Sequence, residues 1–175
     1  MNEPALNIEN NIEISAVLPT DVYLIWNYVE KFLERACKRS NGRHTIDTIY
    51  KQLIDNYANL WVVYNVKDDS VKGCVVTNFV IYPTGLKMLN ILQLSGKNMD
   101  DWMEIGKPIL LDWAKTNNCH GIEAVGREGM SNWLTDKDTK WKKNNLLFEI
   151  MNQKLHKIFI VRVKTILLHY GLIKI

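Results

Sequence analysis

The chain has 175 residues, which is the size of one domain with a single hydrophobic core. Its residues are 47% hydrophobic and 23% charged and its net charge is +3, so the composition excludes a disordered chain and predicts neither a membrane nor a nucleic-acid partner. Residues 151–175 carry five of the 22 basic side chains and none of the 19 acidic ones, which leaves residues 1–150 with a net charge of −2. We therefore treat residues 1–150 as the domain and residues 151–175 as a basic tail.

The cysteine count and the absence of targeting signals indicate where the protein works. Cys37, Cys74 and Cys119 are few, odd in number and dispersed, which is typical of reduced thiols in the cytosol. No Cys-x-x-Cys motif or histidine-rich pairing predicts a metal site. The chain starts without a basic stretch and an apolar signal core, and no apolar run reaches the roughly 20 residues of a membrane span. We therefore expect a cytoplasmic protein without a bound metal.

The first forty residues predict one strand and one helix. Residues 11–17 alternate between apolar and polar side chains, as a half-buried strand does. Pro19-Thr20-Asp21 then opens a helix whose apolar stripe runs over residues 22–37 at three- and four-residue steps. Ser40-Asn41-Gly42 ends this helix.

A second helix is expected to start near Thr45. Its apolar side chains follow the same steps and end with Ile54 and Tyr57, which we place on its buried face. The period then changes to that of β-strands, and short turns join three strands into an antiparallel meander. These strands are predicted at residues 60–66, 71–82 and 86–94.

The rest of the chain alternates between helix and strand. Asn98 is expected to cap a helix over residues 99–116, in which Pro108 should produce a kink because it lacks a backbone donor. A strand at residues 119–125 returns beside the meander, which implies a parallel pairing. A short helix and two more strands are then expected at residues 129–134, 141–150 and 159–164. The last of them either completes the sheet or belongs to a basic extension of a finished domain.

The predicted order is β-α-α-β-β-β-α-β-α-β-β, an α/β (α+β) domain with a mixed central sheet. This order resembles that of the GNAT (Gcn-five-related N-acetyltransferase) superfamily, over roughly residues 12–150. Three stretches are also similar to small GNAT-like proteins of tailed phages, some of which are internal virion proteins. The resemblance implies a location in the cytoplasm of a host cell or in a virion. The three stretches are Ser40-Asn41-Gly42-Arg43-His44, Gly73-Cys74-Val75-Val76-Thr77 and Gly126-Arg127-Glu128-Gly129.

The resemblance implies a cofactor turn after the fourth strand. In GNAT enzymes this turn has the pattern Gln/Arg-x-x-Gly-x-Gly/Ala, and its backbone amides bind the pyrophosphate of acetyl-CoA. Gln93 and Gly96 match the pattern, whereas Asn98 replaces the final small residue. The predicted cofactor-binding residues are Gln93, Leu94, Ser95, Gly96, Lys97 and Asn98.

Acidic residues weaken this prediction of a cofactor turn. Asp100 and Asp101 follow in the first helical turn, where two carboxylates would repel a diphosphate, although Lys97 offsets part of the repulsion. Acidic first-turn residues are also ordinary helix-start chemistry, which needs no ligand to explain it. The sequence therefore predicts a degenerate phosphate-binding turn, with acetyl-CoA as the possible cofactor.

Three residues are candidates for acid–base catalysis, each with a structural alternative. Glu123 lies in the strand that splays from its neighbour in GNAT folds, where a carboxylate could take a proton from an amine; alternatively it faces solvent at the sheet edge. His44 has a reference pKa near neutrality, but beside Arg43 it also suits a helix start. Tyr64 could protonate a leaving thiolate, or it packs in the core.

Two further groups of residues allow a functional and a structural interpretation. Four basic residues at the end of the first helix either recognise an anionic substrate or partner, or complement the helix C-terminus. Six tryptophans could stack on nucleic-acid bases, but Trp26, Trp102 and Trp113 fall on apolar stripes and predict core packing. The basic residues are Arg35, Lys38, Arg39 and Arg43.

Two functions from different classes follow. The first is an acetyl-CoA-dependent N-acyltransferase that acts on a small molecule or another amine acceptor. The second is a non-catalytic GNAT-like protein of a virion, or one that binds a host protein. Nucleic-acid binding through residues 151–175 is a weaker alternative, because five basic side chains provide only modest electrostatic attraction to phosphates.

Overall fold

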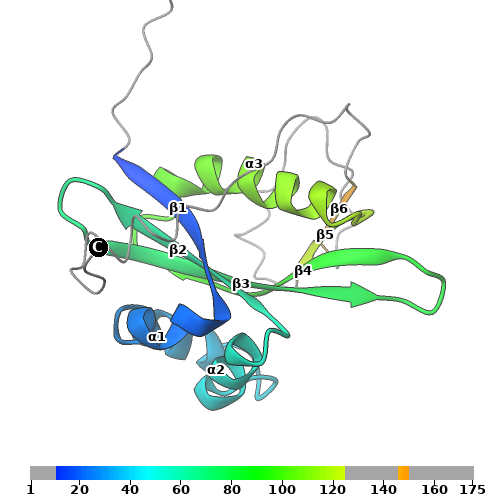
Figure 1. Cartoon of the computed structure of the whole chain (residues 1–175), viewed down its shortest axis with the longest axis horizontal. Helices are drawn as coiled ribbons and strands as arrows, with labels where there is room; N and C mark the ends of the chain where they lie inside the picture. Colours follow the sequence, from blue (N-terminus) through cyan, green and yellow to red (C-terminus); the bar gives the residue numbers. More distant parts are fainter. Residues whose placement is uncertain (1–10, 125–145, 150–175) are drawn as a thin grey trace, which may run out of the picture.

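The computed structural model describes residues 11–124 and 146–149 of the chain. They form one sheet with the strand order β1-β2-β3-β4-β5-β6, in which only the β4–β5 pair is parallel. Helices α1 and α2 cover one face of this sheet and α3 covers the other (Figure 1). The predicted mixed sheet is confirmed, as is the predicted order of elements as far as Ala124. The elements are β1 (Ile12–Val17), the 3-10 helix η1 (Pro19–Asp21), α1 (Val22–Lys38), α2 (Ile46–Ile54), β2 (Asn59–Asn65), β3 (Val71–Ile81), β4 (Lys87–Gly96), α3 (Asp100–Thr116), β5 (Gly121–Ala124) and β6 (Leu146–Glu149).

The face under α1 and α2 is an apolar core that the sequence pattern predicts. The stripe on α1 is buried at three- and four-residue steps, and Thr45 caps α2 through a reciprocal capping box with Thr48. Alternate residues of the strands complete this core. Its most buried members include Val29, Leu33, Ile49, Leu60, Val62, Cys74 and Val76.

The other face holds a second core under α3, with Trp102 at its end. The Trp102 side chain is 1% exposed, and its ring lies against Gly73 and Gly96, which are paired across β3 and β4. A Cβ atom on Gly96 would come within 2.7 Å of Cζ2 of Trp102, and one on Gly73 within 3.1 Å of it. The Trp102 indole also donates a hydrogen bond to the Lys97 carbonyl at 3.1 Å. Two glycines without side chains therefore make the space that this indole fills.

The structure corrects the predicted end of the second helix. Ile54 is 44% exposed and Tyr57 is 75% exposed, although both were expected on the buried face. The helix ends at Ile54 with Asp55 as its C-cap, and Asn56 adopts a left-handed conformation with φ of 61°. The chain therefore turns away before Tyr57, and the helical period no longer places that side chain on the core face.

The structure also corrects the expected cap of α3. The N-cap position is Met99, without a side-chain hydrogen bond, and the helix begins at Asp100. Asn98 lies one residue earlier with φ of 46°, in the left-handed region that asparagine tolerates better than most residues. Asn98 therefore reverses the chain between β4 and α3 instead of capping the helix. Pro108 lies inside α3 as predicted.

All three cysteines are free and buried. Burial raises the pKa of the Cys37, Cys74 and Cys119 thiols, and the Glu34 carboxylate adds to the increase at Cys37. The prediction of reduced thiols is consistent with this placement. The strand predicted at residues 141–150 is found in part as β6, whereas the helix at residues 129–134 and the strand at residues 159–164 lie outside the described residues.

We expect Gly96→Ala to lower the free energy of unfolding by about 1–3 kcal/mol, because its methyl group overlaps the Trp102 ring in a filled core. Urea denaturation measures this change. The matched control is Gly106→Ala in α3, whose new Cβ would come within 3.0 Å of the flexible end of Ile14 and make only an ordinary contact with Trp102 at 4.0 Å, while it gains up to about 1 kcal/mol of helix propensity. Equal destabilisation by the two variants would contradict the packing argument.

Candidate functional site

The candidate site lies along the second half of β4. β4 and β5 pair in parallel from Met88 to Ile91 on β4, and the last described pair joins Ile91 to Ala124, where the described part of β5 ends. β4 continues to Gly96, and within the described residues this second half has no partner on its β5 side. A register shift against β3 makes Leu92 a bulge directly after the last parallel pair. A bulge bends a strand and locally interrupts its ladder of hydrogen bonds, so β4 bends at Leu92.

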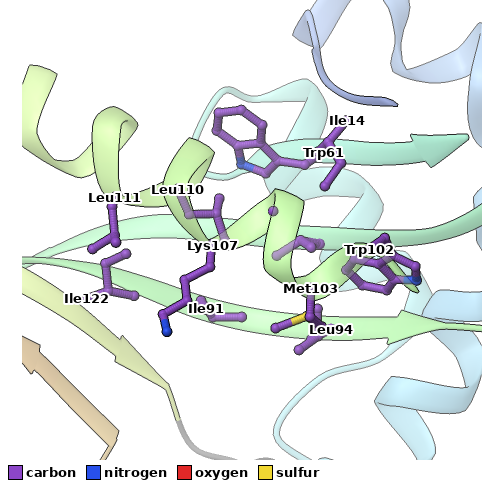
Figure 2. Close-up of a pocket in the computed structure, with 12 residues that line it drawn as sticks. Ile14, Trp61, Ile91, Leu94, Trp102, Met103, Lys107, Leu110, Leu111 and Ile122 are labelled. Atoms are coloured by element: carbon purple, nitrogen blue, oxygen red, sulfur yellow. The ribbon is translucent and has the colours of Figure 1, made fainter. Parts of the chain in front are cut away.

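An apolar hollow lies beside this part of β4, between α3 and the sheet (Figure 2). Its volume is about 30 Å³, enough for one or two water-sized groups. Ile91 and Leu94 from β4, Ile122 from β5 and Met103 from α3 contribute to its wall, and Lys107 is the one charged residue that lines it. Such a wall suits a short apolar chain and not a phosphate.

The predicted phosphate turn is divided between strand and loop. Gln93, Leu94, Ser95 and Gly96 are the last residues of β4 and pair with β3, so only Lys97 and Asn98 lie in the loop before α3. The Lys97 amide donates to the Lys72 carbonyl at 2.7 Å, and the amides of Asp101 and Trp102 bond within the first turn of α3.

The backbone amide of Asn98 donates no hydrogen bond to another backbone group within the described part of the chain. The same is true of the neighbouring Met99 amide. The turn therefore presents fewer amides to a ligand than the sequence pattern suggests.

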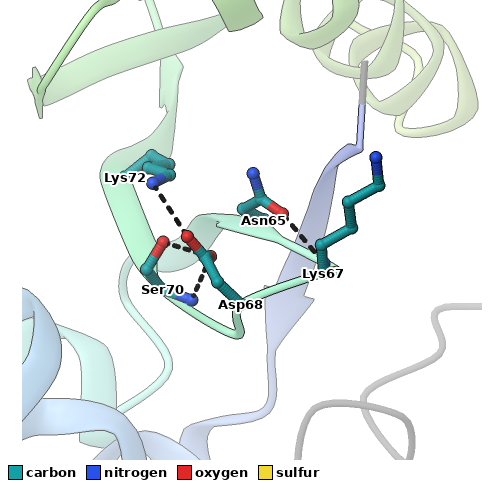
Figure 3. Close-up of polar contacts among 5 residues, drawn as sticks. All are labelled: Asn65, Lys67, Asp68, Ser70 and Lys72. Carbon is teal, nitrogen blue, oxygen red and sulfur yellow. Dashed lines mark hydrogen bonds and ion pairs between the residues drawn. The ribbon is translucent and has the colours of Figure 1, made fainter. Parts of the chain in front are cut away.

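The β2–β3 turn fixes the position of Lys72, the partner of Lys97. Asp68 accepts hydrogen bonds from the Ser70 amide at 3.0 Å and from its hydroxyl, and its other oxygen lies 3.7 Å from Nζ of Lys72 (Figure 3). The Ser70 hydroxyl is the main reason why the pKa of Asp68 lies below its usual value. This turn therefore helps to set where β3 begins, and through the Lys72 carbonyl where the loop after β4 lies.

Gln93 is a buried polar side chain with an unused donor. It is 6% exposed, and its Nε2 atom has no hydrogen-bond partner in the described part of the chain. Its strand partner Val76 belongs to the core under α1, so the Gln93 amide points to that face. An unsatisfied buried donor costs stability, so this side chain is unfavourable as a purely structural residue.

Tyr64 and Glu123, two of the predicted catalytic residues, are far apart. Tyr64 is buried in the core under α1, where its hydroxyl donates to Glu13 at 2.7 Å. Glu123 lies on β5, three strands from β2, which corresponds to about 14 Å. Its carboxylate accepts hydrogen bonds from the Tyr82 hydroxyl at 3.1 and 2.9 Å. These two residues therefore do not face one reacting atom.

His44 lies in the loop before α2, among the residues that end α1. Its amide donates to the Ser40 hydroxyl at 3.1 Å, and the Arg43 guanidinium donates to the Ser40 carbonyl at 3.3 Å. Burial, and to a smaller degree the Arg43 charge, lower the pKa of His44 below 6.5. Of the four basic residues noted in the sequence, Arg35 and Lys38 lie in the last turn of α1, the position that complements a helix C-terminus.

Sequence reasoning did not single out Tyr82, Asn78 or Asn90. All three lie around the β3–β4 hairpin, where Asn90 donates to Asn78 at 3.0 Å. A signal was available, because a tight turn centred on Thr84 fixes the register of the hairpin and places Asn78 opposite Asn90. Each asparagine is polar where a core strand would have an apolar residue.

Comparison with known proteins supports the class of fold. Neither a family model nor a curated protein matches the sequence. A predicted acetyltransferase from Clostridium acetobutylicum, solved with acetyl-CoA, is similar in structure, with a TM-score of 0.50 and 14% identity over 76% of this chain and 96% of that one. At such identity the likeness concerns the fold alone.

Two aminoglycoside acetyltransferases from uncultured soil metagenomic samples are also similar. One, solved with trehalose and with sisomicin, has a TM-score of 0.56 and 11% identity over 89% of this chain and 100% of its own. The other has a TM-score of 0.51 and 12% identity over 86% of this chain and 98% of its own. The chain therefore has a GNAT-like fold.

The described residues contain neither a candidate metal site nor a candidate membrane-spanning helix. Among residues 11–124 and 146–149, no three His, Cys, Asp or Glu side chains are grouped so that they could hold a metal ion. Within the same ranges no helix combines the length and the apolar character that crossing a bilayer requires.

We expect Gln93→Met to raise the free energy of unfolding by about 1 kcal/mol, because it removes a buried unsatisfied amide at nearly constant volume. Urea denaturation measures the change. Thr77→Val is the matched control, because buried Thr77 accepts a hydrogen bond from the Trp61 indole at 3.0 Å and its loss should cost about 1–3 kcal/mol. A loss of stability in Gln93→Met would mean that the Gln93 amide is satisfied.

We expect the free energy of unfolding to fall as the pH is lowered from about 6.5. The pKa of His44 is lower in the folded than in the unfolded protein, so protonation of His44 favours the unfolded state. His44→Gln should flatten this part of the profile, measured by chemical denaturation at several pH values. Arg43→Gln should keep most of the slope, because burial is the larger cause of the lowered pKa. An unchanged slope in His44→Gln would contradict this assignment.

Proposed function

We propose that the chain is an acetyl-CoA-dependent N-acyltransferase with an amine acceptor. One observation carries the proposal: β4 bulges at Leu92 and continues to Gly96, beyond its last pair with the described part of β5. This leaves a strand edge that can hydrogen-bond an extended amide chain, beside an apolar hollow and ahead of the 17-residue helix α3. The neighbour from Clostridium acetobutylicum was solved with acetyl-CoA, which supports the choice of cofactor.

The residues of this site suit the two ends of acetyl-CoA unequally. The free edge of β4 and the apolar wall fit the amide-containing arm. The diphosphate would meet the amides of Asn98 and Met99 and the Lys97 ammonium, but also the first-turn carboxylates Asp100 and Asp101. We therefore propose weak binding through a degenerate turn.

Acetyl-CoA supplies an activated thioester to an amine nucleophile. Of the predicted catalytic residues we assign Glu123 as the base that takes the amine proton, because its strand partner Asn90 lies two residues before the Leu92 bulge of β4. Tyr64 lies three strands from Glu123 and donates to Glu13 on the adjacent strand β1, and His44 lies in the loop after α1. We assign these two residues structural roles.

A non-catalytic GNAT-like protein is the second candidate. It is favoured by the Lys97–Lys72 hydrogen bond, which occupies one amide of the turn, and by the acidic start of α3. Such a protein would act through a protein partner, and the tailed-phage origin with a virion or host-cytoplasm location remains the hypothesis from sequence. The division into a domain at residues 1–150 and a basic tail at residues 151–175 likewise remains a prediction.

Calorimetric titration with acetyl-CoA tests the proposal. We expect the wild type to bind weakly and Asp100→Ala/Asp101→Ala to bind about tenfold more tightly, because two repelling charges are removed. Glu30→Ala/Glu34→Ala on α1 is the control for the same change in net charge. Absence of binding by both the wild type and Asp100→Ala/Asp101→Ala would contradict the acyltransferase and favour the non-catalytic protein.

A further inference from the structure

Three polar side chains form a row across adjacent strands, two residues before the Leu92 bulge of β4. Asn78 on β3, Asn90 on β4 and Glu123 on β5 are direct register partners. They lie on the face that α1 and α2 cover, two positions beyond Val76 and Leu92 of that core. All three are partly exposed. The row therefore continues the core face into an accessible polar surface.

Tyr82 orients the carboxylate at one end of this row. Tyr82 follows β3 whereas Glu123 lies on β5, so the tyrosine spans β4 to donate to both carboxylate oxygens. The hydrogen bond to Glu123 is the main reason why the pKa of Tyr82 is raised, which keeps the phenol protonated as a donor. The carboxylate is thus held in place by a neutral group.

Several polar atoms of the row remain available to a ligand. Within the described part of the chain no Lys, Arg or His side chain pairs with Glu123. The Asn90–Asn78 hydrogen bond uses Nδ2 of Asn90 and Oδ1 of Asn78, and no other bond among the described residues occupies Oδ1 of Asn90 or Nδ2 of Asn78. An uncompensated carboxylate beside a free carbonyl oxygen attracts a cation that donates hydrogen bonds.

Strand spacing sets the shape of such a ligand. Neighbouring strands lie about 4.8 Å apart, so Glu123 and Asn90 can share one ammonium group, whose three donors suit both acceptors. Asn78 lies a further strand away, about 10 Å from Glu123, and its amide would donate to an oxygen of the same ligand. The row therefore fits an amine on an oxygen-bearing carrier.

We propose that Asn78, Asn90 and Glu123 bind a primary amine whose carrier offers an acceptor oxygen within about 10 Å of the nitrogen, as an amino sugar does. The row lies one residue pair before Ile91 and Ala124, the last described pair of β4 and β5. An amine held there is two residues from the Leu92 bulge of β4. Its role as the acyl acceptor rests on the proposed function, whereas the binding of the amine does not.

Titration of the full ¹⁵N-labelled chain with glucosamine tests this site, with glucose as the ligand that lacks the amine. We expect glucosamine to shift the amide resonances around Asn78, Asn90 and Glu123, and glucose to leave them unchanged. Glu123→Gln should weaken glucosamine binding at least tenfold while it keeps an acceptor for Tyr82. Glu34→Gln on α1 should not change the affinity.

A second pair of ligands isolates Asn78. Asn78→Ala should weaken glucosamine but not methylamine, which has no carrier oxygen for the Asn78 amide to bind. Wild-type protein that ignores glucosamine, or that binds it no more tightly than Glu123→Gln does, would overturn the site. A parallel titration with acetyl-CoA separates the two proposals. If glucosamine binds while neither the wild type nor Asp100→Ala/Asp101→Ala binds acetyl-CoA, the site is supported and the acyltransferase is contradicted. The reverse result overturns the site alone.

Discussion

The packing of one indole against two glycines determines where α3 begins and where β4 ends. Trp102 fills the space that Gly73 and Gly96 leave, and its Nε1 atom bonds to the Lys97 carbonyl while the Lys97 amide bonds to Lys72. These contacts draw the residues expected to form a phosphate turn into the end of the strand and its first loop residues. The same contacts that stabilise the junction therefore limit the amides that an anion could reach.

This constraint separates the two halves of the candidate cofactor site. The second half of β4 bends at the Leu92 bulge, and the apolar hollow beside it is lined in part by Trp102 itself. The diphosphate end, in contrast, depends on the loop that the indole holds and on the acidic start of α3. The candidate site therefore suits the extended amide-containing arm of acetyl-CoA better than its charged diphosphate.

Local periodicity predicted most of the fold, because the apolar stripes of α1 and the alternation in β2 and β3 depend on neighbours in sequence. It failed where the chain leaves regular structure. Asn56 and Asn98 both adopt positive φ, and neither the placement of Tyr57 nor the true start of α3 follows from a repeat of apolar residues. Part of the predicted phosphate turn lies on β4, because Ser95 and Gly96 continue the β3 pairing, a long-range contact that the local pattern does not encode. Predicting the row of Asn78, Asn90 and Glu123 requires the order of the strands β3, β4 and β5. The sequence predicts only the register of the β3–β4 hairpin.

The reactivity of the three buried thiols can report local opening of the fold. Cys74 lies at the centre of the sheet with no exposed surface, Cys37 lies near the end of α1, and Cys119 lies between α3 and β5. A thiolate is the reactive form, and burial suppresses it at each position. Alkylation must therefore wait for the surrounding element to detach, so the order in which the three sulfurs react follows the order in which these regions of the fold loosen.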